Sequence, residues 1–266
     1  MGYNVSMKYY VVADVHGFYT ELIQALTENG FFENKEQRKL IVCGDLFDRG
    51  NEAVKVQDFI AELVRRDEVI LIRGNHDDMI VDLVRVYGEG TKVPLIESLH
   101  EANGTAETVL QLTGMDWDEV DARPKVMKER MENSSLFTTI LPAMIDYFET
   151  GNYIFVHGWI PCITKGPRCS IYSYEYYAKW RDADEEKWRA ARWYNGMEAA
   201  RQGVVEPSKT IICGHWHCSY GHSRIEGKGS QMGKEADYSP YYNEGIIAID
   251  ACTVRSHKIN CIVIED

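Results

Sequence analysis

Short apolar runs alternate with amphipathic segments along the first 80 residues. Residues 9–13, 39–43 and 68–73 are rich in aliphatic side chains, which predicts three buried β-strands. Between these runs, residues 20–29 and 54–66 place apolar side chains at helical spacing. Such alternation of strand and helix is typical of βαβ units, so we expect an α/β fold in which neighbouring strands run parallel.

The pattern changes after residue 79. Residues 79–148 predict mostly helix, which we interpret as a helical insertion beside the main sheet. Residues 175–201 also predict a helix, whereas residues 219–244 show little periodicity and predict a long loop, a kind of segment that is usually functional or mobile. Further strands are predicted at 153–156, 209–213, 245–249 and 258–264. Because no repeat or low-complexity tract divides the chain, we expect residues 1–266 to form a single domain.

Composition narrows the class of protein. The net charge of −12 argues against a protein that coats nucleic acid, because such binding needs lysine and arginine to neutralise phosphates. No apolar run is long enough for a membrane span, and the first residues lack the features of a signal peptide. The seven cysteines form no CxxC pair, which favours reduced thiols over a zinc ribbon. We therefore expect a cytoplasmic, bacterial-type protein that does not bind membranes.

Candidate chemistry lies at the ends of five predicted strands. Each strand runs into a polar cluster, and ligand sites in open α/β sheets form at the carboxyl ends of strands. The clusters contain Asp14 and His16; Asp45, Asp48 and Arg49; Arg73, Asn75, His76 and Asp77; His157; and His215 and His217. Taken singly, each has an ordinary explanation, such as a helix cap or a turn. All five together predict a metal site, because carboxylate, amide and imidazole groups suit divalent Mn, Fe or Zn.

These clusters resemble the motifs of the calcineurin-like metallophosphoesterase family. The similar segments are Asp14-Val-His-Gly, Gly44-Asp-Leu-Phe-Asp-Arg-Gly, Gly74-Asn-His-Asp, Val156-His-Gly and Gly214-His-Trp-His. The Asp-Arg-Gly ending and the arginine before Gly-Asn-His are similar to the phosphoprotein phosphatase branch, which also includes diadenosine tetraphosphatases. The resemblance implies a two-sheet β-sandwich with helices outside both sheets.

The resemblance also implies a role for each matching residue. It implies two divalent ions, with Mn as the first expectation and Fe or Zn as alternatives. Asp14 and His16 match ligands of the first ion, Asp45 matches the carboxylate that bridges both ions, and Asn75, His157 and His215 match ligands of the second. His76 matches the general acid, Asp48 the residue that holds its ring, and Arg49 and Arg73 the phosphate-binding arginines.

Several further positions depart from the family's pattern or match none of its motifs. His217 is usually missing from eukaryotic phosphoprotein phosphatases, but the wider family uses this histidine on the first ion, so we expect it to be a ligand here. A further phosphate-binding arginine is expected between the fourth and fifth motifs, and the sequence does not choose between Arg189 and Arg192. His100, His222 and His257 match no motif and are interpreted as surface or core residues.

The predicted activity is hydrolysis of a phosphate monoester by a hydroxide that bridges the two ions. The motif details favour a serine/threonine-type protein phosphatase acting on a phosphorylated protein or peptide. The alternative is a dinucleoside tetraphosphatase, for which four tyrosines offer surfaces that could stack on a base: Tyr172, Tyr174, Tyr176 and Tyr177. A catalytically silent metal-binding scaffold is the third hypothesis, although every expected catalytic residue is present. Substrate choice is expected to depend on the insertion and on the 219–244 loop.

Overall fold

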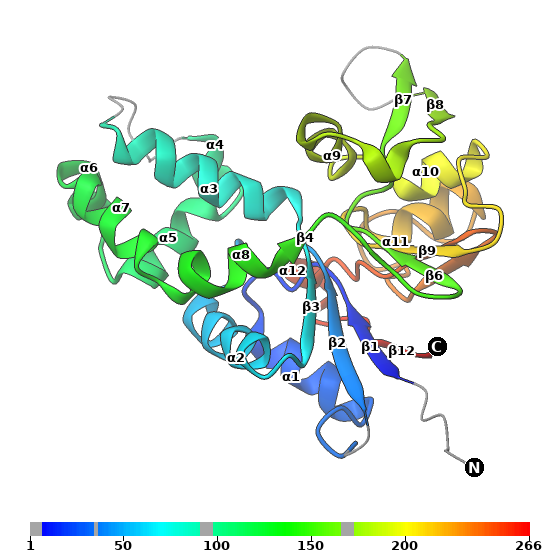
Figure 1. The fold of residues 1–266 in the computed structure, drawn as a ribbon, viewed down its shortest axis with the longest axis horizontal. Helices are drawn as coiled ribbons and strands as arrows, with labels where there is room; N and C mark the ends of the chain where they lie inside the picture. The colour runs from blue at the N-terminus through cyan, green and yellow to red at the C-terminus, as the bar shows by residue number, and fades with distance from the viewer. Residues whose placement is uncertain (1–6, 35–36, 91–97, 166–172) are drawn as a thin grey trace.

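Two five-stranded sheets lie face to face at the centre of the molecule (Figure 1). The computed structural model describes residues 7–34, 37–90, 98–165 and 173–266. The first sheet has the order β12 (Ile262–Glu265), β1 (Lys8–Val12), β2 (Arg38–Cys43), β3 (Val69–Ile72) and β4 (Met144–Ile145). The second has the order β10 (Tyr241–Asn243), β11 (Ile246–Ala248), β9 (Thr210–Cys213), β6 (Tyr153–Phe155) and β5 (Phe148–Glu149).

The inner strands of each sheet run parallel. In the first sheet β1 to β4 are parallel, and only β12 pairs antiparallel with β1. In the second, β6, β9 and β11 are parallel, and the edge strands β5 and β10 are antiparallel. The predicted βαβ alternation is thus confirmed, and the carboxyl ends of seven parallel strands point toward one edge of the sandwich.

Side chains along each strand point alternately to the two faces of its sheet, and this alternation forms the layers of the fold. Successive residues of a strand face opposite sides, so each sheet contributes to two cores. The core between the sheets contains Val11, Ala13, Ile41, Cys43, Ile72, Phe155, Ile212 and Ile249. The residues between these positions, such as Val12 and Val42 in the first sheet and Ile154 and Ile211 in the second, face the flanking helices. The two-sheet sandwich flanked by helices is confirmed.

Helices cover the outer faces of both sheets (Figure 1). The amphipathic α1 (Tyr19–Glu28) and α2 (Ala53–Arg65) bury their apolar sides against the first sheet. Outside the second sheet lie α9 (Glu185–Ala191) and α10 (Gly196–Arg201), whose first turns are capped by the side chains of Asp184 and Asn195.

The predicted insertion forms a group of helices, here called the helical lobe, at one end of the first sheet (Figure 1). The first helix starts at Asn75, four residues earlier than predicted, because the Asp77 carboxylate accepts a hydrogen bond of 2.8 Å from the Gly74 N–H. Met127 and Met131 are among the buried residues of its interior. The lobe comprises α3 (Asn75–Gly88), α4 (Leu99–Ala102), α5 (Thr105–Thr113), α6 (Trp117–Ala122), α7 (Pro124–Glu132), a π-turn at Leu136–Ile140 and α8 (Leu141–Ala143).

Two local predictions were wrong. Residues 175–201 are not one helix: β8 (Ser173–Tyr176) pairs with β7 (Cys162–Lys165), a 3₁₀ turn follows at Trp180–Asp182, and α9 and α10 start separately. Residues 219–244 are not a structureless loop, since they include most of α11 (Cys218–Tyr220), a π-turn at Gly221–Ile225 and β10. The last helix, α12 (Thr253–Ser256), precedes β12. No helix within the described residues is long and apolar enough to span a membrane.

Candidate metal centre

The polar residues at the strand ends converge at the edge of the sandwich where the parallel strands end. Asp14 and His16 follow β1, Asp45 follows β2, and Asn75 and His76 begin α3 just after β3. His157 and His215 follow β6 and β9 in the second sheet. The site is therefore built between the two sheets, as the strand-end pattern predicted.

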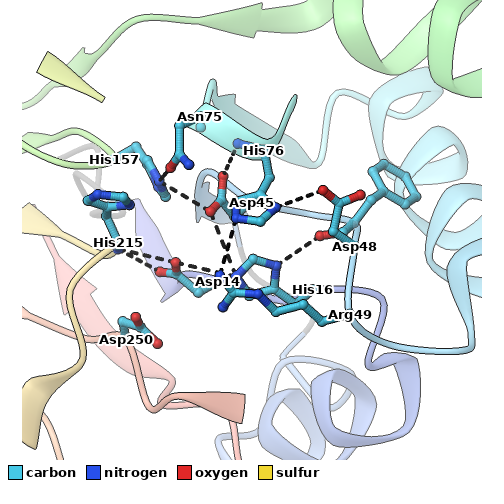
Figure 2. A network of polar contacts seen from close by, with 12 residues as sticks. Asp14, His16, Asp45, Asp48, Arg49, Asn75, His76, His157, His215 and Asp250 are labelled. Carbon is cyan, nitrogen blue, oxygen red and sulfur yellow. Dashed lines mark hydrogen bonds and ion pairs between the residues drawn. The ribbon is translucent and has the colours of Figure 1, made fainter. Parts of the chain in front are cut away.

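Asp45 lies at the centre of this arrangement (Figure 2). Its carboxylate oxygen Oδ2 is 3.7 Å from His16 Nε2 and 3.4 Å from His157 Nε2, and its Oδ1 accepts a hydrogen bond of 2.9 Å from the His76 N–H. Two clusters of donor atoms share this residue, one with His16 and His76 and the other with His157 and His215. In each cluster the donor atoms lie within 4.8 Å of one another. A carboxylate shared by two donor clusters is the arrangement that a dinuclear metal site requires.

The other predicted ligands lie at different distances from these two donor clusters. Asn75 Oδ1 is 2.8 Å from His157 Nε2, so it borders the second cluster. Asp14 Oδ1 is 3.9 Å from His16 Nε2, and the same carboxylate accepts hydrogen bonds of 2.9 and 3.2 Å from the His215 N–H. His217 belongs to neither cluster among the described residues; its Nε2 lies 4.0 Å from Asp250 Oδ2.

Charges at this site fit a bound cation. Asp14 and Asp45 are almost fully buried, and burial together with the Asp250 charge raises the pKa of Asp14 well above its usual value. Burial lowers the pKa of His157, but the Asp45 carboxylate outweighs burial and raises that pKa to about 10. Burial and the neighbouring His157 lower the pKa of His215 to about 3. The buried carboxylates thus favour a positive charge beside them, which is why the His157 pKa is raised. A divalent cation bound here would supply that positive charge instead.

The predicted general acid and its partner are in contact. His76 Nδ1 lies 2.7 Å from Asp48 Oδ2, and both side chains are buried. Burial lowers the pKa of His76, but the Asp45 charge and the Asp48 hydrogen bond outweigh it and raise that pKa. On the other side of the ring, Arg49 Nη2 is 3.2 Å from His76 Nε2. Nε2 and the exposed Arg49 guanidinium therefore meet at the open side of the site.

The other predicted arginines are already paired. Asp78 joins Arg73 to Arg192: its Oδ1 is 2.8 Å from Arg73 Nε and its Oδ2 is 2.6 Å from Arg192 Nη1. Arg192 is buried and also contacts Asp146 at 2.5 Å. Both terminal nitrogens of Arg192 are used in this network, whereas Arg189 forms a more exposed pair of 2.7 Å with Asp82.

Two acidic residues of the site were missed in the sequence. Asp250 is buried, follows β11 and accepts a hydrogen bond of 2.7 Å from the Cys252 N–H. The sequence could have indicated Asp250, because it directly follows the strand predicted at 245–249, as the other site residues follow theirs. Asp78 gave no such signal, because it lies in the first turn of a helix, where acidic residues are common, and its partner Arg192 is distant in sequence.

The tyrosines proposed as base-stacking surfaces take other roles. Tyr174 is buried, and the Tyr176 hydroxyl donates a hydrogen bond of 2.5 Å to Glu206. Tyr177 packs against the core outside the second sheet, and Tyr172 lies outside the described residues. An aromatic side chain that does border the site is Trp193, which is 52% exposed and has its ring centroid 5.8 Å from that of His215.

Comparison with known proteins identifies the family. The profile of the family described as calcineurin-like phosphoesterase matches residues 7–219. The asymmetrical bis(5′-nucleosyl)-tetraphosphatase of Bacillus velezensis is 30% identical over 120 residues, 43% of this chain and 45% of that protein. The symmetrical enzyme of Buchnera aphidicola is 33% identical over 124 residues, 47% of this chain and 42% of that protein. The matches thus span about half the length of these curated relatives.

A solved structure shows the same fold. The cold-active protein-tyrosine phosphatase of a Shewanella species aligns with a TM-score of 0.55 and 14% sequence identity, covering 98% of this chain and 77% of that one. The family profile spans most of the sequence, and the matched region contains the Asp45-centred donor clusters. The chain therefore belongs to the calcineurin-like phosphoesterase family.

Proposed function

We propose that the protein hydrolyses dinucleoside polyphosphates. The observation that carries this proposal is the similarity of the chain to bis(5′-nucleosyl)-tetraphosphatases of both the asymmetrical and the symmetrical kind, at 26–33% identity. This similarity favours the alternative given by the sequence over the serine/threonine protein phosphatase. The likeness to a protein-tyrosine phosphatase, at 14% identity, concerns the fold and not the substrate.

In this proposal the strand-end residues hold two divalent ions. Asp14, His16 and Asp45 form one set of ligands, and Asp45 is shared with a second set, Asn75, His157 and His215. His217 completes the first set after its side chain turns from Asp250. When bound, such ions lower the pKa of a coordinated water and stabilise charge on phosphoryl oxygens. Mn is our first choice of metal, with Fe or Zn as alternatives.

The chain's own residues bind and orient the substrate. Arg49 is exposed at the open side of the site, where its forked guanidinium can hold two phosphoryl oxygens. Arg73 is partly buried and forms an ion pair with Asp78 through Nε, and in this proposal its terminal N–H groups bind phosphoryl oxygens. His76 Nε2 lies 3.2 Å from Arg49 Nη2, so a phosphate bound by Arg49 would lie within reach of this ring nitrogen, which in this proposal gives a proton to the departing oxygen.

Trp193 supports a substrate that carries a nucleobase. Its ring is half exposed and lies next to His215, and its backbone is fixed because the preceding Arg192 is held in the buried ion-pair network. Exposed indole rings bind bases by stacking, whatever the base. We therefore propose Trp193 as the stacking surface for one base of the dinucleotide.

A turnover assay in the presence of Mn tests this function. Diadenosine tetraphosphate, a phosphothreonine peptide and p-nitrophenyl phosphate are compared, first with the unchanged protein. We expect the dinucleotide to have the highest kcat/KM, and a preference for the peptide would overturn the proposal. Trp193→Ala should raise KM for the dinucleotide roughly tenfold and leave p-nitrophenyl phosphate, which has no base, unaffected. Phe32→Ala, an exposed aromatic beyond α1 at the opposite end of the first sheet, is the control.

A further inference from the structure

The helical lobe contributes His76 from the start of α3, and a second helix of the lobe, α5, contacts the loop that carries Asp48 and Arg49. Three polar side chains at a spacing of three residues, Thr105, Thr108 and Gln111, share one face of this helix and contact the segment from Asp48 to Ala53. Gln111 accepts a hydrogen bond of 2.9 Å from the Ala53 N–H and donates one of 3.0 Å to the Gly50 carbonyl. The segment after β2 is therefore hydrogen-bonded to α5 at three positions, Asp48, Gly50 and Ala53.

The two threonines bind the carboxylate that holds the His76 ring. The Thr105 hydroxyl donates to Asp48 Oδ2 at 2.7 Å, the same oxygen that His76 Nδ1 approaches at 2.7 Å. The Thr108 hydroxyl donates to Asp48 Oδ1 at 3.0 Å and accepts from the Asp48 N–H at 2.9 Å. Asp48, Thr105 and Thr108 are all completely buried. Each carboxylate oxygen thus has a fixed partner, which leaves Asp48 no freedom to rotate away from His76.

Backbone contact makes this arrangement rigid. Gly104 precedes α5 with a φ of +82°, and a Cβ at this position would lie 2.3 Å from the backbone nitrogen of Arg49. The helix therefore starts directly against the Asp48–Arg49 peptide, and only glycine allows that approach. Asp48 and Arg49 both have positive φ values, 76° and 65°, a strained conformation that needs support from its surroundings.

We propose that Thr105 and Thr108 are positioning residues, through which the helical lobe orients the Asp48–His76 pair for proton donation to the leaving oxygen. Neither threonine touches the substrate. Their hydroxyls fix the Asp48 carboxylate, Asp48 fixes the imidazole ring, and the ring directs Nε2 toward the open side of the site beside Arg49. Through α5, the helical lobe thus contributes to the orientation of the catalytic residues. This inference rests on the proton-donor role proposed for His76.

The dependence of turnover on the leaving group tests this proposal. Loss of a general acid slows esters of weakly acidic alcohols more than esters of strongly acidic phenols, because only the former need a proton as they depart. The full chain with Mn is therefore assayed on phenyl phosphate and on p-nitrophenyl phosphate. Thr105→Ala and Thr105→Ser lack the same methyl group and differ only in the hydroxyl, so a folding defect common to both cancels in the comparison.

We expect Thr105→Ala to lower kcat for phenyl phosphate roughly ten- to hundredfold, with a much smaller loss for p-nitrophenyl phosphate and KM nearly unchanged. Thr105→Ser should retain the activity of the unchanged protein, and Thr108→Ala should behave as Thr105→Ala. The control is Thr113→Ala, on the same helix, whose buried hydroxyl donates only within the helix, to the Val109 carbonyl at 2.6 Å. Equal losses on both esters, or equal losses in Thr105→Ala and Thr113→Ala, would overturn the proposal.

His76→Asn, measured in parallel, separates this proposal from the one on which it rests. It should lower kcat for phenyl phosphate roughly 10²–10⁴-fold with the metal content unchanged. If His76→Asn slows phenyl phosphate far more than p-nitrophenyl phosphate and Thr105→Ala does not, the positioning role is wrong and the acid stands. If His76→Asn turns over phenyl phosphate normally, the acid role itself is wrong.

Discussion

At the scale of single residues, the site depends on unusual backbone conformations. Most of the described non-glycine residues with positive φ belong to it, namely Asp14, His16, Asp45, Asp48, Arg49 and His215. Such conformations cost about 1–3 kcal/mol each and persist where the surroundings impose them. Aspartate and histidine tolerate them better than most residues, so the same residue types serve both the turns and the chemistry.

Glycines at the site leave space for the ligands. A Cβ on Gly74 would lie 2.1 Å from Asp45 Oδ1, and one on Gly214 would lie 2.1 Å from Asp14 Oδ2. These glycines have negative φ values, so it is the close approach of a carboxylate, and not backbone freedom, that excludes a side chain. The glycines of the Gly-Asn-His and Gly-His-Trp-His motifs are thus required by packing.

Gly74→Ala should therefore weaken metal binding. The added methyl group would push the Asp45 carboxylate out of the centre of both donor clusters, and we expect a loss of metal affinity of about 10- to 100-fold. Isothermal titration with Mn measures this loss. Gly151→Ala is the control, since its nearest neighbour would be a side-chain oxygen of Asp266 at 3.3 Å. Comparable metal affinities in the two variants would contradict the argument.

The sequence indicated which side chains converge where these follow a strand, and did not indicate it where they contact a distant segment. Asp14, Asp45 and His157 follow short apolar runs, so their convergence could be inferred from the geometry of parallel strands alone. Thr105 and Thr108 look like ordinary helix residues in the sequence. Their importance arises from the packing of α5 against the loop after β2, a long-range contact that local patterns do not encode.

At the scale of elements, α9 shows how two neighbouring arginines differ. The Arg192 side chain is 3% exposed and pairs with Asp78 and Asp146, and Asp78 also holds Arg73. The Arg189 side chain is 46% exposed and forms a single pair with Asp82. Arg189 within α9 is therefore largely at the surface, whereas Arg192, which directly follows α9, connects the end of this helix to α3 and to the segment after β4.

Replacing these arginines should have unequal effects on stability. Arg192→Ala leaves the buried Asp78 with one partner fewer and is expected to lower the free energy of unfolding by about 3 kcal/mol. Arg189→Ala removes an exposed pair and should cost less than about 1 kcal/mol. Urea denaturation followed by circular dichroism measures both values. Similar losses in the two variants would show that the network around Asp78 contributes no more than a surface pair.

Element boundaries were predictable where the hydrophobic pattern is long and regular. The strands β1 to β3 and helices α1 and α2 lie within about two residues of their predicted limits. The β7–β8 hairpin was missed because each of its strands has only four residues, and only Tyr174 among the residues of β8 is buried. Strands this exposed lack the apolar alternation by which a strand is recognised.

At the scale of the whole molecule, the proposed ligands come from both sheets. Asp14, His16, Asp45 and Asn75 follow strands of the first sheet, and His157 and His215 follow strands of the second. Metal bound between them would link the two layers at the edge where the parallel strands end. A ligand that binds only the folded state also stabilises it by mass action.

Metal removal is therefore expected to lower the melting temperature. At Mn concentrations a thousandfold above the dissociation constant, binding contributes about 4 kcal/mol, which corresponds to about 10 °C for a chain of this size. Differential scanning calorimetry with Mn, and then with a chelator in excess, measures the shift. In the Asp45→Asn variant the shift should be much smaller. A full shift in that variant would mean that the stabilising metal binds elsewhere.

The pairing of β1 with β12 has a consequence for how the protein assembles. The strand that delivers Asp14 and His16 is flanked on one side by β2 and on the other by a strand formed from residues 262–265. The first sheet is incomplete until this distant segment arrives, and closing so long a loop is slow relative to forming local helices. During synthesis on the ribosome, the first three motifs therefore emerge long before β1 gains its second neighbour, and until then the edge of β1 is open to pairing with other chains.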